Sequence, residues 1–240
     1  MALEITVGPP RLAINQGYGV LITEQDGQIP WPTDKGFYHS DTRVISSWQI
    51  FADGEPWDLL NSGNTAHYAA RIFLTNRTIH TEIGAVPAGT LGLVIGRSIA
   101  GGIHEDLDLV NHGMVKVQFN LEIVVRSDFA DLFEVKSGNI VRRGRITTTW
   151  SQSRSRLKTA YRNKGFERIV TTTVRKCGSS PVYANGRISF EIELQPGEAW
   201  HSCLLYAIGD GTSVDEAPDH CIGGSGGAQI GRRHYRDRRC

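Results

Sequence analysis

The chain has 240 residues, of which 40% are hydrophobic, so it can bury the core of one large domain or of two small ones. Its formal net charge is +1, but residues 222–240 alone hold five Arg and one Asp. The other 221 residues carry 21 basic and 24 acidic side chains, and this slight excess of acid argues against a nucleic-acid partner.

The sequence shows none of the signals that direct a chain into or across a membrane. Residues 1–7 have neither a charged n-region nor an apolar h-region, and no apolar run approaches the roughly 20 residues that span a bilayer. The cysteines show no C-x-x-C spacing, which favours thiols in a reducing compartment. We therefore expect a cytoplasmic protein with no membrane partner.

Short apolar runs bounded by turn residues predict strands along most of the chain. Asp53-Gly54 is a strong hairpin signal, and Gln195-Pro196-Gly197-Glu198 suits a type II turn that joins the last two strands. Residues 29–34 are expected to form a loop, because prolines flank Trp31. The predicted strands cover residues 3–7, 18–23, 37–52, 57–60, 68–75, 91–100, 103–110, 115–125, 146–150, 156–161, 168–175, 187–194 and 199–208.

The clearest strand runs from Val115 to Val125, where apolar and polar residues alternate with only one break. A period of two over this length is incompatible with an amphipathic helix. The turn Asn111-His112-Gly113 precedes it, so we predict that residues 101–110 and 115–125 form one long antiparallel hairpin.

About twelve strands and no long helix predict an all-β fold, a large antiparallel β-sandwich of two sheets, over residues 1–221. A short helix is expected at Asp128–Val135. Residues 222–240 are rich in Gly and Arg and poor in apolar side chains, so we expect a disordered C-terminal tail.

Four segments resemble one protein family. They are Gly36–Ser46, which contains Asp-Thr-Arg, together with Gly101–Glu105, Asp128–Val135 and Leu194–Trp200. Their order and spacing are similar to those in the N-terminal domain of bacterial amylo-α-1,6-glucosidases, which are glycogen debranching enzyme-like glycoside hydrolases. The resemblance extends from about residue 12 to about residue 215.

This resemblance implies a large β-sandwich that is followed in the family by an (α/α) barrel holding the catalytic carboxylates. Residues 222–240 do not have the composition of such a barrel, so we expect this chain to be accessory or structural in carbohydrate metabolism and inactive alone. Its expected partner is the barrel, on a separate subunit or otherwise missing here. The alternative is a free-standing carbohydrate-binding module that binds an α-glucan. No cofactor is expected.

Two motifs supply candidate site residues. Asp128, Asp131 and Glu134 are spaced three apart, so a helical turn would align the paired carboxyl groups that glycoside hydrolysis requires. The alternative is structural, with Asp128 as a helix cap and the other two bound to Arg or backbone donors. Asp41 and Arg43 either face the active site of a partner domain or belong to a buried ion pair.

The aromatic and metal-binding side chains leave further alternatives. Trp31 could stack on a sugar ring or cover an edge of the core. Phe129, Leu132 and Phe133 are expected to anchor their segment to the core. The eight histidines show no paired ligand spacing, and although His104 and Asp106 share a strand face, we predict no metal site.

Overall fold

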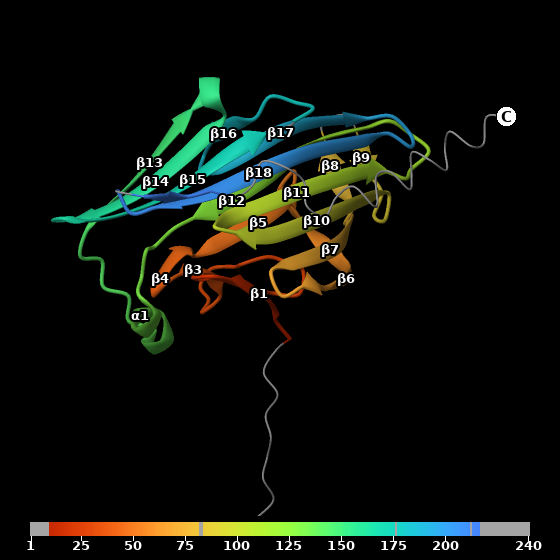
Figure 1. Cartoon of the computed structure of the whole chain (residues 1–240). Helices are drawn as coiled ribbons and strands as arrows, with labels where there is room; N and C mark the ends of the chain where they lie inside the picture. Colours follow the sequence, from red (N-terminus) through yellow and green to blue (C-terminus); the bar gives the residue numbers. More distant parts are fainter. Residues whose placement is uncertain (1–9, 82–83, 176, 212, 217–240) are drawn as a thin grey trace, which may run out of the picture.

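The computed structural model describes residues 10–81, 84–175, 177–211 and 213–216. Within them the chain is almost entirely β-structure, which confirms the predicted all-β antiparallel fold (Figure 1). The strands are β1 Leu12–Gln16, β2 Gly19–Thr23, β3 Gly36–His39, β4 Thr42–Ile45, β5 Ser47–Ala52, β6 Glu55–Ala66, β7 Ala69–Asn76, β8 Ile79–Thr81, β9 Gly84–Val86, β10 Leu91–Ala100, β11 Gly102–Asn111, β12 Val117–Arg126, β13 Arg145–Ser151, β14 Arg156–Asn163, β15 Phe166–Arg175, β16 Val182–Ala184, β17 Arg187–Leu194, β18 Ala199–Gly209 and β19 Val214–Asp215. The helices are α1 Leu132–Ser137 and a 3-10 turn, Gln152–Arg154.

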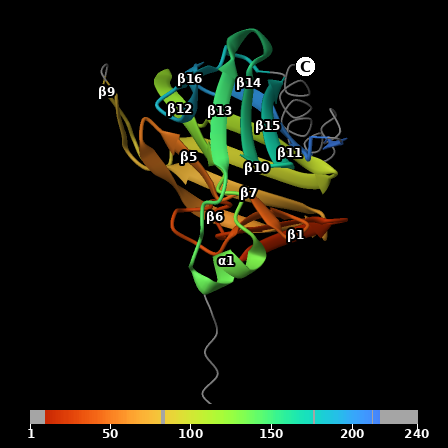
Figure 2. The same ribbon diagram turned by 90° about the vertical axis from the view of Figure 1, so that its left-hand side faces the viewer.

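Most strands belong to one 13-stranded antiparallel sheet in the order β13-β14-β15-β18-β11-β10-β7-β6-β5-β12-β17-β16, with β19 beside β18. A four-stranded sheet, β1-β2-β3-β4, and the pair β8-β9 complete the described part of the chain. The large sheet curls until it is nearly closed (Figures 1 and 2). Strands that are far apart in this order therefore pack against each other. The ring of Trp48 on β5 lies 4.5 Å from that of Tyr206 on β18, and Phe190 on β17 lies 5.3 Å from Trp200 on β18.

The predicted turn at Asp53-Gly54 joins β5 to β6. Both residues have positive φ, 46° and 82°, as a type I′ turn requires. The alternation predicted in β12 is also observed, since Phe119, Leu121 and Ile123 are buried. Val115, however, precedes the strand and is exposed.

The predicted hairpin between residues 101–110 and 115–125 is wrong. β11 pairs with β10 and β18, whereas β12 pairs with β5 and β17. The segment around Asn111 is therefore a crossing between two parts of the sheet. The Asn111 amide stabilises it by donating to the carbonyls of Val115 and Leu194. A turn signal predicts that the chain reverses but does not specify which strands pair.

The turn at residues 195–198 forms as predicted, with a hydrogen bond from Glu198 N to the Gln195 carbonyl and φ of 75° at Gly197. It joins β17 and β18, which are not neighbours in the sheet, so it too is a crossing. The strand predicted at residues 3–7, the boundary at residue 221 and the tail at residues 222–240 lie outside the described residues. None of the helices in the described ranges is long and apolar enough to span a membrane.

One buried ion pair lies inside the apolar core. The guanidinium of Arg97 binds Glu105 at 2.8 Å, lies 3.8 Å from the ring centroid of Trp48 and donates to the carbonyl of Gly27. The hydroxyl of Tyr206 donates to the other oxygen of Glu105 at 2.8 Å. Burial raises the pKa of Glu105, although Arg97 opposes this, and burial next to Glu105 raises the pKa of Tyr206 well above its ordinary value. Because Arg97 and Tyr206 both bind the carboxylate of Glu105, this side chain can be buried in the apolar core.

Candidate functional site

Helix α1 begins at Leu132 and is capped by Asp131. The Asp131 side chain accepts from the backbone N–H groups of Phe133 and Glu134 at 2.8 and 2.9 Å, and Glu134 accepts in return from the Asp131 N–H. This is a complete capping box. Gly138, with φ of 70°, ends the helix in the left-handed conformation. A helix of six residues depends on such caps, because it has few internal hydrogen bonds of its own.

The helix is held against the small sheet at one end of the molecule (Figure 1). Val135 of α1 and Ala130 pack on Tyr38 of β3 in a small cluster separate from the main core. The hydroxyl of Tyr38 donates to the Asp34 carbonyl at 2.6 Å. Burial raises the pKa of Tyr38, and the nearby Arg43 opposes that rise.

Arg43 connects β4 to the segment before α1. Its Nε donates to Asp128 Oδ1 at 3.2 Å and its Nη2 to the other oxygen, so the pair is bidentate. Nη1 donates to the carbonyls of Thr33 and Lys35 at 2.6 and 3.2 Å. A Cβ at Gly36 would lie 2.6 Å from Cδ of Arg43, so the glycine leaves room for this side chain. The backbone of β4 also pairs with the segment, from Arg43 N to the Ala130 carbonyl at 2.8 Å.

A groove of about 760 Å³ lies between this segment and the hairpin of β14 and β15. One wall carries the carboxyl groups of Asp128, Asp131 and Glu134, and the opposite wall is formed by side chains of the hairpin. Trp31, which is 56% exposed, also lines the groove, and the Arg43 guanidinium lies 5.9 Å from its ring centroid. The lining residues are Trp31, Thr42, Asp128, Phe129, Ala130, Asp131, Glu134, Gly138, Asn139, Ile140, Val141, Arg142, Arg143, Tyr161, Asn163 and Phe166.

Comparison with known proteins identifies the family. Residues 14–205 match the family described as the N-terminal domain of (some) glycogen debranching enzymes. The chain belongs to this family. The match extends from β1 to β18 and therefore includes both walls of the groove.

A solved structure shares the fold of this debranching-enzyme N-terminal domain. A putative kojibiose phosphorylase from the human microbiome is 8% identical, with a TM-score of 0.55 over 94% of this chain and 32% of its own. The present chain therefore spans about a third of that phosphorylase. A putative aldose 1-epimerase from Escherichia coli K12 is 12% identical, with a TM-score of 0.48 over 84% of this chain and 99% of its own. No curated protein matches the chain in sequence.

The structure brings four of the six candidate residues into the groove of this debranching-enzyme domain. Trp31, Asp128, Asp131 and Glu134 line it, and Arg43 lies behind Asp128. Asp41 lies in the turn between β3 and β4, where its side chain is exposed and its backbone carbonyl accepts from Leu132 N at 2.9 Å.

Two details of the predicted segment are wrong. The helix begins four residues later than expected, because Phe129 has φ of 53° and cannot be helical. The cap is consequently Asp131, while Asp128 binds Arg43. Phe129 is buried against Tyr161, with ring centroids 5.8 Å apart, but Phe133 is 80% exposed and does not anchor the segment to the core.

The side of the groove formed by β14 and β15 was not predicted from the sequence. Tyr161, Asn163 and Phe166 come from this hairpin, and Arg143 pairs with Glu134 across nine residues. The sequence signal available was the short Asn163-Lys164-Gly165 turn between two predicted strands, which marks a hairpin tip but does not specify its neighbours. A separate group of metal-binding side chain types lies on β11 and β18, outside the groove.

Proposed function

We propose that this chain is the accessory N-terminal domain of an amylo-α-1,6-glucosidase-like protein and that its groove docks on the (α/α) catalytic barrel. The observation that carries the proposal is the family match over residues 14–205, which includes the groove. The matched phosphorylase supports it, because two thirds of that chain lies outside the region of similarity. In this proposal the barrel supplies the catalytic carboxylates, and the present domain binds to the barrel without taking part in the reaction.

The groove has the surface of a docking site. Exposed apolar side chains line it, and they come from the loop before β3, from the segment after α1 and from β15. Exposed apolar groups clustered in this way usually mark an interaction site, whereas single ones are common on any protein. The exposed apolar side chains that line the groove are those of Trp31, Ile140, Val141 and Phe166, which are 56%, 37%, 46% and 44% exposed.

Polar groups inside the groove would give the docking its orientation. Arg142 and Arg143 line the groove beside the three acidic side chains. Such paired charges at an interface favour one orientation of the partner over others. An accessory domain needs a fixed orientation if it is to hold a loop or a substrate at the barrel.

The test is calorimetric titration of this chain with a separately produced (α/α) barrel domain of the same family. We expect saturable binding, and we expect Phe166→Ser to weaken it at least tenfold, because aromatic anchors at an interface commonly contribute about 1–2 kcal/mol or more. Phe73→Ser is the matched control, since Phe73 is 38% exposed but does not line the groove. Absence of binding, or equal effects of the two substitutions, would overturn the proposal.

A second function, binding of an α-glucan, is favoured by Trp31. Its exposed ring lines a groove that is also lined by Asn139 and Asn163, and sugar sites combine an aromatic face with such polar groups. Titration with maltoheptaose, monitored by tryptophan fluorescence, tests it. Binding that Trp31→Ala removes would support a carbohydrate-binding module, and an unchanged signal would count against it.

A further inference from the structure

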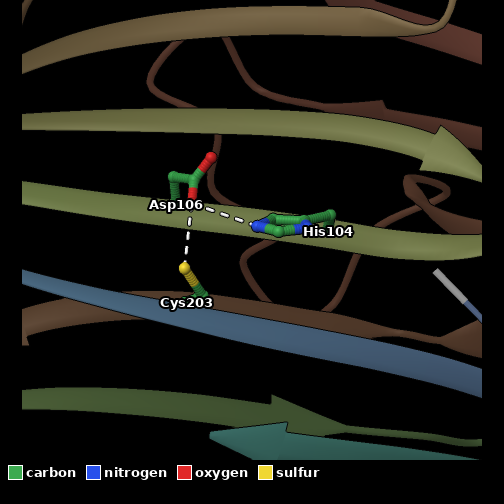
Figure 3. Close-up of side chains that lie close together, drawn as sticks. All are labelled: His104, Asp106 and Cys203. Carbon is green, nitrogen blue, oxygen red and sulfur yellow. Dashed lines mark hydrogen bonds and ion pairs between the residues drawn. The ribbon is translucent and has the colours of Figure 1, made fainter. Parts of the chain in front are cut away.

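Five side chains with metal-binding chemistry face the same side of two neighbouring strands. β11 and β18 are antiparallel, with Asp106 opposite Cys203 and Asp108 opposite His201. Glu105 and Leu107 of β11 face the core, so His104, Asp106 and Asp108 point to the other face of the sheet. Figure 3 shows the side chains of His104, Asp106 and Cys203 converging there.

Three ligand atoms in this cluster lie within 4.8 Å of one another, and His201 approaches two of them. Asp106 Oδ1 lies 3.1 Å from His104 Nε2, 3.1 Å from Cys203 Sγ and 3.9 Å from His201 Nε2. Cys203 Sγ lies 3.1 Å from His201 Nε2, and the ligand atoms of His104, Asp106 and Cys203 are all within 4.8 Å of one another. Zinc bonds of about 2.0–2.3 Å at tetrahedral angles separate the ligand atoms by about 3.3–3.8 Å. Small shifts of these side chains would therefore admit an ion.

Asp108 orients the fourth ligand. Its carboxylate lies 2.8 Å from Nδ1 of His201, which directs Nε2 toward Cys203. A carboxylate on the far nitrogen of a histidine is the usual support of a metal-bound imidazole.

Charge and access also suit a divalent ion. The carboxylate of Asp106 and the thiolate of Cys203 together balance two positive charges. Asp106 and Asp108 line a pocket of about 310 Å³, which gives an entry path, and Arg71 lines the same pocket. His104, Asp106 and Cys203 are buried, and such a dry site strengthens each metal bond.

We propose that His104, Asp106, Cys203 and His201 bind one zinc ion or a divalent metal of similar preference, which ties β11 to β18 near the middle of the large sheet. A mixed set of imidazole, thiolate and carboxylate ligands selects zinc over the oxygen-preferring magnesium and calcium ions. Four protein ligands leave no open position, so the ion is structural. Binding forms a metal–sulfur bond and releases the proton of the Cys203 thiol to water.

The probe is Co²⁺, which replaces zinc and absorbs in the near ultraviolet when it binds a thiolate. The purified full chain is stripped with a chelator and titrated with CoCl₂. We expect one equivalent to bind with a thiolate-to-metal band and one equivalent of ZnCl₂ to displace it. Asp108→Asn should weaken binding about 10- to 100-fold, as substitution of such an orienting carboxylate does.

Cysteine variants locate the sulfur ligand. Replacing the other three cysteines, Cys177, Cys221 and Cys240, by serine leaves Cys203 as the single thiol, and this triple variant should keep the band. Cys203→Ser should lose it. No band in the wild type, loss of the band in a folded triple variant, or a band that survives in Cys203→Ser would overturn the proposal. If Cys203→Ser fails to fold, the triple variant still decides, because its only thiol is Cys203.

Discussion

Arg43 and Arg77 each pair with an aspartate, but only Arg43 does so away from water. The side chains of Arg43 and Asp128 are 1% and 12% exposed, against 52% and 50% for Arg77 and Asp58. We expect Arg43→Met to cost about 3–5 kcal/mol of unfolding free energy, because it leaves Asp128 largely buried without its partner. The matched Arg77→Met should cost about 0–1 kcal/mol. Urea unfolding measures both, and equal losses would contradict the importance assigned to the buried pair.

The partner of Arg43 and the cap of α1 could not be predicted from the sequence. Asp-Thr-Arg indicated a buried ion pair as one alternative for Arg43, but its partner is 85 residues away. The capping residue was likewise misplaced by three positions, because nothing in the local pattern predicts the positive φ of Phe129. Phe129 instead packs against Tyr161 of β14, which is a tertiary contact.

At the scale of the element, α1 depends on its cap. Asp131→Ala removes the acceptor for the N–H groups of Phe133 and Glu134, so we expect a loss of about 1 kcal/mol and a frayed helix. Asp131→Asn is the control, because asparagine caps nearly as well. Limited proteolysis of α1 together with thermal unfolding measures the effect. Equal protection of α1 in both variants would show that packing on Tyr38, and not the cap, maintains the helix.

Strands were predictable from period and turn chemistry, whereas their partners were not. The Asp53-Gly54 hairpin formed because two residues that tolerate positive φ fix a tight reversal. Asn111-His112-Gly113 has a similar composition but leads from β11 to a strand five places away in the sheet. The difference lies in which apolar faces can pack together, and this depends on the whole core.

At the scale of the molecule, the curled sheet brings residues together that no local pattern relates. Trp48 and Tyr206 meet across the core, and Asp106 meets Cys203 after 97 residues of chain. The resemblance to debranching enzymes indicated the family, but the groove wall from β14 and β15 and the cluster on β11 and β18 required the structure.

The groove carboxylates already have structural partners, so we expect the purified chain not to hydrolyse α-1,6- or α-1,4-glucosidic bonds. Glycoside hydrolysis requires one carboxyl group to donate a proton and a second to attack or to activate water. Asp128 instead binds Arg43, Asp131 accepts from two N–H groups of α1, and Glu134 pairs with Arg143. Release of reducing sugar from glycogen and from maltoheptaose should equal that of a buffer blank. Turnover in the wild type that both Asp128→Asn and Asp131→Asn abolish, while each variant stays folded, would place an active site in this groove and refute the accessory role.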